Sequence, residues 1–110
     1  MTMNKIGVLG AGTMGAGIAQ LFASSGLDVV LRDIDHSLVE KGLASIEGSL
    51  GRLVARGQLE ATEKDAITAR IDGTTDLNRF SGCHLIVEAI VENMEVKKTI
   101  FSEMDNICHP

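Results

Sequence analysis

The chain has 110 residues, of which 45% are hydrophobic and 3% are aromatic. This length allows one domain, with a mainly aliphatic core of the kind found in parallel sheets covered by helices. Acidic residues outnumber basic ones by 15 to 10, giving a formal net charge of −5, and the basic residues form no cluster. Nucleic acid and anionic membranes are therefore not expected as partners.

No targeting or membrane segment is predicted. The first residues lack a basic region followed by a long apolar run, and no apolar stretch approaches the length of a membrane span. Cys83 and Cys108 are isolated among aliphatic neighbours, which is typical of reduced cysteines in a cytoplasmic protein. No metal site is predicted.

The stretch from Lys5 to Gln20 joins a short apolar run to three spaced glycines, Gly10, Gly12 and Gly15, and then to a helix-like pattern. This order predicts a strand, a tight turn and a helix, which is the dinucleotide-binding fingerprint. The first glycine frees the turn, the second lets the backbone approach a pyrophosphate, and the third lets the helix lie close to the strand.

The start of this helix and the end of the next strand complete the predicted cofactor site. The N–H groups of Gly12, Thr13 and Met14 are expected to face an anion, because they lie at the positive end of the helix dipole. Asp33 ends a second strand about 20 residues further on, where a carboxylate accepts hydrogen bonds from the adenosine ribose. A turn that bound no ligand would leave Asp33 unexplained. Because a 2′-phosphate would meet the Asp33 carboxylate, the sequence predicts NAD rather than NADP. The neighbouring Arg32 is the one residue that argues for NADP.

Two helices are predicted after this unit. The first is long, starts near Asp35 with Ser37 and Glu40 spaced as a capping box, and carries one apolar stripe. The second starts near Thr62 and is short. Together they form a helical hairpin that protrudes from the sheet.

The rest of the chain alternates again between strand and helix patterns. A short third strand is predicted over 71–75, a polar connection over 76–82, and a strand buried on both faces over 84–91. Asn93 is placed to cap a last helix. The predicted fold is an α/β, Rossmann-like, doubly wound parallel sheet that is incomplete, with a protruding helical hairpin.

Four segments together resemble the NAD-binding domain of the 3-hydroxyacyl-CoA dehydrogenases. They are Gly10–Gln20, Asp33, Val87–Asn93 with its sequence Val-Glu-Ala-Ile-Val-Glu-Asn, and Val96–Lys97. The resemblance implies that residues 1–110 form the N-terminal portion of an NAD-binding domain. It also implies the activity of the family, which oxidises 3-hydroxyacyl-CoA to 3-ketoacyl-CoA and transfers hydride to NAD.

The resemblance also assigns roles to individual residues. It places cofactor contacts at Gly10, Ala11, Gly12, Thr13, Met14, Gly15, Asp33, Glu92 and Lys97. Glu92 and Lys97 would lie beside the nicotinamide. On residue type alone, without the resemblance, helping to start an exposed helix is the more ordinary role for them. The acyl-CoA substrate would contact Ser49 and Arg56, where arginine stands in place of the lysine of related members. Ser49 could also be an ordinary polar surface residue.

Parts of the family pattern have no match in this sequence. The family's Ser-Asn-Thr-Ser-like strand, its catalytic His–Glu pair and its helical dimerisation domain are among them. His36, His84 and His109 do not match the catalytic position, so no catalytic residue is predicted. The 110-residue chain is expected to be inactive alone. It is also expected to self-associate as a homo-oligomer, because the strand over 85–91 would lie at or near an unpaired sheet edge.

Two other functions fit parts of the pattern. The chain could be a stand-alone NAD-binding module or an inert fragment without catalysis. It could also resemble a 3-hydroxyacid dehydrogenase of the 6-phosphogluconate type, which shares the Gly-x-Met-Gly turn. That type usually uses NADP, and Asp33 argues against it.

Overall fold

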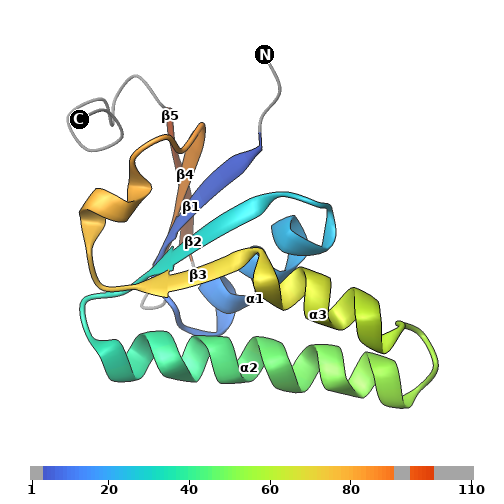
Figure 1. Ribbon diagram of the computed structural model, residues 1–110. Helices are drawn as coiled ribbons and strands as arrows, with labels where there is room; N and C mark the ends of the chain where they lie inside the picture. The colour runs from blue at the N-terminus through green and yellow to red at the C-terminus, as the bar shows by residue number, and fades with distance from the viewer. Residues whose placement is uncertain (1–3, 91–94, 101–110) are drawn as a thin grey trace.

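The computed structural model describes residues 4–90 and 95–100, which form a sheet covered by helices (Figure 1). The elements in chain order are β1 (Lys5–Leu9), α1 (Thr13–Ser24), β2 (Asp28–Arg32), α2 (His36–Ala55), α3 (Ala61–Ala69), β3 (Ile71–Thr74), the 3-10 helix η1 (Leu77–Phe80), β4 (Leu85–Ile90) and β5 (Glu95–Ile100). The strand order is β3-β2-β1-β4-β5, and β1 to β4 are parallel. The predicted Rossmann-like α/β fold is confirmed. Within the described ranges, no helix has the length and apolarity needed to cross a membrane.

The register of β1 with its two neighbours positions the site. Leu9, the last residue of β1, lies opposite Arg32 of β2 and opposite Glu88 of β4. Because the three strands are parallel, the loops that follow β1 and β2 leave the same edge of the sheet. Ligands of open α/β sheets bind at this edge, where the strand order reverses.

Each face of the sheet packs against a different layer. Alternating side chains of β1 and β2, such as Ile6 and Leu31, pack with the helices in the larger core cluster. The opposite face packs around Phe80 of η1, and a Cβ on Gly7 would lie 3.0 Å from its ring. The segment predicted as a polar connection therefore contains a buried aromatic side chain.

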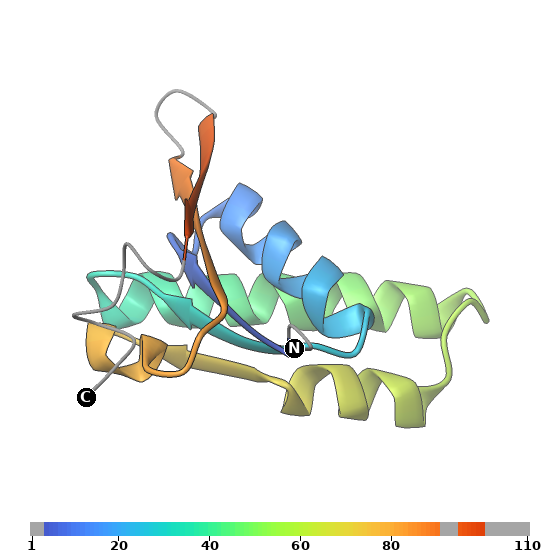
Figure 2. The same ribbon diagram turned by 90° about the horizontal axis from the view of Figure 1, so that it is seen from above.

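The predicted helical hairpin is confirmed, although its helices start at other residues. Asp35, and not Ser37, is the N-cap of α2, because its carboxylate accepts hydrogen bonds from the Ser37 N–H at 2.8 Å and hydroxyl at 2.9 Å. α3 starts at Ala61 with Glu60 as N-cap, not at Thr62. Figures 1 and 2 show the three helices grouped together, with the α2–α3 turn extending beyond the strands.

The cap of α2 leads to a prediction about pH. The backbone N–H of Ser37, followed by its hydroxyl, holds the pKa of Asp35 below its usual value of 3.8. Ionised Asp35 therefore stabilises the fold above that pH, and this contribution is lost as the pH falls through the lowered pKa. We expect Asp35→Ala to lower the thermal midpoint at pH 7, and Asp35→Asn to keep most of the stability of the unaltered chain. The difference in thermal midpoint between Asp35→Ala and the unaltered chain is expected to shrink below pH 3.8. Thermal unfolding of the three proteins across this pH range measures the effect. A difference between Asp35→Ala and the unaltered chain that does not change with pH would contradict it.

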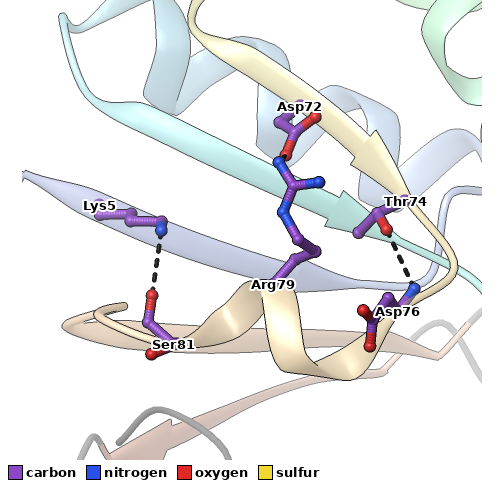
Figure 3. A network of polar contacts seen from close by, with 6 residues as sticks. All are labelled: Lys5, Asp72, Thr74, Asp76, Arg79 and Ser81. Carbon is purple, nitrogen blue, oxygen red and sulfur yellow. Dashed lines mark hydrogen bonds and ion pairs between the residues drawn. The ribbon is translucent and has the colours of Figure 1, made fainter. Parts of the chain in front are cut away.

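Polar contacts hold η1 against the sheet (Figure 3). The N–H of Asp76, the N-cap of η1, donates to the hydroxyl of Thr74 of β3 at 3.0 Å, and Arg79 pairs with Asp72 of β3. Lys5 of β1 donates to the carbonyl oxygen of Ser81 at 3.0 Å. These contacts fix the connection that carries Phe80 into the core.

The prediction of a last helix is wrong for the residues of this segment that the structure describes. Residues Glu95–Ile100 form β5, which pairs antiparallel with β4 from Leu85↔Ile100 to Ile90↔Glu95 (Figure 2). Val96, Thr99 and Ile100 are β-branched, and an unpaired edge of β4 offers a row of backbone donors and acceptors. Pairing at this edge therefore prevails over the helical periodicity of the segment. The expected cap, Asn93, lies outside the described residues.

The pairing of β5 also changes what was expected of β4. β4 lies near the sheet edge, as predicted, but β1 and β5 pair with it on its two sides. The prediction that its backbone groups are unpaired is therefore wrong, and this was the physical basis for expecting self-association. Self-association itself stays a prediction.

Candidate functional site

The glycine loop after β1 is closed by backbone contacts that exclude larger residues. Gly10 has φ +104°, and a Cβ on it would lie 2.5 Å from the carbonyl oxygen of Ala89. A Cβ on Gly15 would lie 1.7 Å from the carbonyl oxygen of Gly10. The first turn of α1 therefore lies directly on the loop, which confirms the packing predicted for the first and third glycines.

The N-terminus of α1 has the properties of an anion site. Gly12 is the N-cap, with φ −69° and ψ −170°, and no side chain caps the helix there. The first turn contains no acidic residue, and Thr13 is exposed. The first N–H groups of a helix have no partner within it, and the helix dipole adds positive potential to them. These donors are thus available to the oxygens of a phosphate group.

Asp33 connects the end of β2 to this loop. Its Oδ2 accepts a hydrogen bond from the backbone N–H of Ala11 at 2.8 Å, and its Oδ1 accepts one from Ile34 at 2.7 Å. The N–H of Gly10 also donates to the carbonyl of Arg32 at 2.7 Å. The structure thus brings the predicted glycine motif and the predicted acidic residue together at one edge of the sheet.

Arg32 is held by the residue that follows β3. Its Nε donates to the carbonyl oxygen of Thr75 at 3.0 Å. This hydrogen bond engages the Nε of the basic residue that directly precedes Asp33 in the sequence.

A cleft of about 190 Å³ lies between the glycine loop and α2, and the sequence did not predict its α2 wall. It is lined by Ala11, Gly12, Thr13, Leu38, Lys41, Gly42 and Ser45. A Cβ on Gly42 would lie 2.7 Å from the carbonyl oxygen of Ala11, so this glycine allows α2 to approach the loop. The only signal in the sequence is the spacing of four between Lys41 and Ser45, which places them on one face of a helix.

The two predicted substrate residues lie further along α2. Ser49 is half-buried and lines a groove of about 370 Å³ with Gly17, Gln20, Leu21 and Ser24 of α1. Arg56 is the C-cap of α2 and is exposed. The two are seven positions apart, which is about 10 Å along the helix axis. They lie on one side of α2 but are not brought next to Asp33.

Two predicted site residues remain, Glu92 and Lys97, and only Lys97 is among the described residues. Glu92 lies outside the described residues. Lys97 belongs to β5, opposite Glu88, and not to the predicted helix. Their role as nicotinamide neighbours stays a prediction.

The cysteine and the histidines within the described ranges lie at the start of α2 and just before β4. Cys83 is buried in the core cluster around Phe80. His36 lies at the exposed start of α2, 3.7 Å from Glu40. His84 precedes β4, and its N–H donates to the carbonyl of Lys5. Cys108 and His109 are outside the described residues.

Comparison with known families gives a match over nearly the whole chain. Residues 5–110 match the family described as "3-hydroxyacyl-CoA dehydrogenase, NAD binding domain". The chain is 45% identical over 106 residues to a probable 3-hydroxybutyryl-CoA dehydrogenase from Deinococcus radiodurans, covering 96% of the chain and 38% of that protein. It is 38% identical over 104 residues to a 3-hydroxybutyryl-CoA dehydrogenase from Clostridioides difficile, covering 94% of the chain and 37% of that protein.

A solved structure gives the same result. The (S)-3-hydroxybutyryl-CoA dehydrogenase from Ralstonia eutropha superimposes with a TM-score of 0.80 at 40% identity, over 84% of this chain and 32% of that one. The chain therefore spans about two fifths or less of the length of these relatives.

Proposed function

The chain belongs to the family of NAD-binding domains of the 3-hydroxyacyl-CoA dehydrogenases, and from this premise we propose that it is the NAD-binding N-terminal part of such an enzyme. The reaction would oxidise a 3-hydroxyacyl-CoA to the 3-ketoacyl-CoA. The observation that carries the proposal is the meeting of the uncapped α1 N-terminus, the closed glycine loop and Asp33 at one sheet edge.

These residues fit the chemistry of NAD, the cofactor of this family. The N–H groups that follow Gly12 would hold the pyrophosphate, and Asp33 would accept hydrogen bonds from the adenosine ribose hydroxyls. NAD supplies the hydride acceptor when it is bound. A 2′-phosphate would instead meet the Asp33 carboxylate, while Arg32 is already engaged by Thr75.

The proposed acyl-CoA contacts follow one side of α2. Lys41, Arg52 and Arg56 fall within about 60° of one another around the helix axis, at 100° per residue. None of them has an ion-pair partner among the described residues. Coenzyme A carries three phosphate groups, and arginine binds phosphate through two parallel N–H donors. We assign Ser49 and Arg56 to this substrate, with the groove between α1 and α2 beside Ser49.

The test is the binding of both nucleotides to the 110-residue chain. We expect NADH to bind and NADPH to bind about tenfold more weakly or worse, because two like charges a few ångströms apart are unfavourable. Calorimetric titration of each nucleotide measures the difference, followed by acetoacetyl-CoA into the NADH-saturated protein. Equal affinities for NADH and NADPH would contradict the role of Asp33, and no heat from acetoacetyl-CoA would contradict the substrate contacts on α2.

A further inference from the structure

The end of β2 contacts the glycine loop at two neighbouring points. One is a main-chain hydrogen bond from the N–H of Gly10 to the carbonyl of Arg32, at 2.7 Å. The other runs from the N–H of Ala11 to Oδ2 of Asp33, at 2.8 Å, and depends on a side chain. Substitution at position 33 can therefore remove the second contact and leave the first in place.

The surroundings of Asp33 allow it to hold the loop and a ligand together. Ala11 is 3% exposed and Asp33 is half-buried, whereas the bond from Ile34 to Oδ1 is at the surface. An ionised carboxylate offers about four acceptor positions, and the two N–H groups occupy two of them. The others remain for hydroxyl donors.

We propose that Asp33 is a positioning residue for the phosphate-binding loop, in addition to accepting the ribose hydroxyls. Through its bond to Ala11 it fixes the residue that precedes Gly12, and so the direction of the first N–H groups of α1. Recognition of the diphosphate and of the ribose is then coupled through one carboxylate. This inference rests on the proposed function, because it takes the diphosphate to sit at the start of α1.

Two substitutions separate this role from ribose binding. Asp33→Ala and Asp33→Asn remove the same negative charge, but only asparagine keeps an acceptor oxygen. Its carboxamide oxygen is expected to face the N–H of Ala11, because that bond is the more buried of the two, while the N–H of Ile34 can turn to water. The difference between the variants therefore reports on the bond to Ala11 and not on charge.

The probe is 2′,3′-dideoxy-ADP, which has the diphosphate but no ribose hydroxyls, with ADP measured beside it. We expect the Asn variant to bind dideoxy-ADP about three- to tenfold more tightly than the Ala variant, which is the usual net effect of one hydrogen bond. We also expect the amide of Ala11 to exchange with solvent faster in the Ala variant than in the Asn variant, as measured by NMR on the free proteins. Circular dichroism and thermal midpoints establish that both variants are folded.

The outcomes separate the two proposals. Equal affinity of the Ala and Asn variants for dideoxy-ADP, with equal exchange at Ala11, would overturn the positioning role and leave the ribose contact standing. Failure of the unaltered chain to bind ADP or NADH would instead overturn the nucleotide site itself. If the Asn variant bound ADP more tightly than the Ala variant but bound dideoxy-ADP equally, Asp33 would act on the ribose only. That result would also overturn the inference.

Discussion

Replacing Gly15 with alanine is expected to disrupt the glycine loop and abolish NADH binding. The added Cβ would lie 1.7 Å from the carbonyl oxygen of Gly10 and 2.7 Å from its carbonyl carbon. Both are backbone atoms, so no side chain can rotate to relieve the contact. Either α1 must move away from the sheet or the loop must open, and we expect a loss of about 3 kcal/mol or more in the free energy of unfolding. Denaturant unfolding and titration with NADH measure the two effects.

Gly17 provides a matched control on the same helix. A Cβ at this exposed position would meet nothing within 4 Å. Alanine is favoured over glycine inside a helix by about 0.8–1 kcal/mol, so Gly17→Ala is expected to stabilise the chain and to leave NADH binding unchanged. If Gly15→Ala were as stable as Gly17→Ala, the close approach of α1 to Gly10 would be refuted.

The sequence was sufficient where structure depends on local chemistry. The glycine spacing predicted the turn after β1, where Gly10 has φ +104°. The strand patterns over 71–75 and 84–91 correspond to β3 and β4 within one or two residues. Each of these predictions uses neighbours along the chain, so no knowledge of distant contacts was needed.

The start of α2 shows the limit of local patterns. Asp35 and Ser37 are both good N-cap residues, and Ser37 has the additional support of Glu40 three positions later. The structure selects Asp35, whose side chain reaches the N–H of Ser37. Two acceptable caps two residues apart cannot be ranked by spacing alone.

Long-range pairing accounts for the parts that were not predicted. β5 forms because it pairs with the edge of β4, and Phe80 is buried because it packs on the face of the sheet that contains Gly7. Neither contact can be predicted from residues that are close in the sequence. In the site, the identity of Asp33 was predicted but its bond to Ala11 was not, because that bond exists only once β1 and β2 are paired. The approach of Lys41 to the loop likewise depends on the packing of Gly42 against Ala11.

Replacing Gly12 with valine is expected to abolish NADH binding and leave the fold intact. The backbone of Gly12, at φ −69° and ψ −170°, is extended, and β-branched residues adopt this conformation readily. Position 12 thus differs from position 15, where the surrounding backbone forbids any side chain. A valine side chain at the N-cap would stand in the space that a phosphate needs in order to reach the first N–H groups of α1.

The expected loss of binding is large because charge-assisted hydrogen bonds are involved. Each bond to a charged group contributes about 1.5–3 kcal/mol, so losing two weakens binding by more than about 100-fold. Gly17→Val is the control, since it adds the same side chain at an exposed position five residues later in the chain. Helix content from circular dichroism should match in the two variants, while NADH should bind only to Gly17→Val. Normal NADH binding by Gly12→Val would show that the pyrophosphate does not lie on this loop, and the cofactor would then have to be placed elsewhere on the sheet edge.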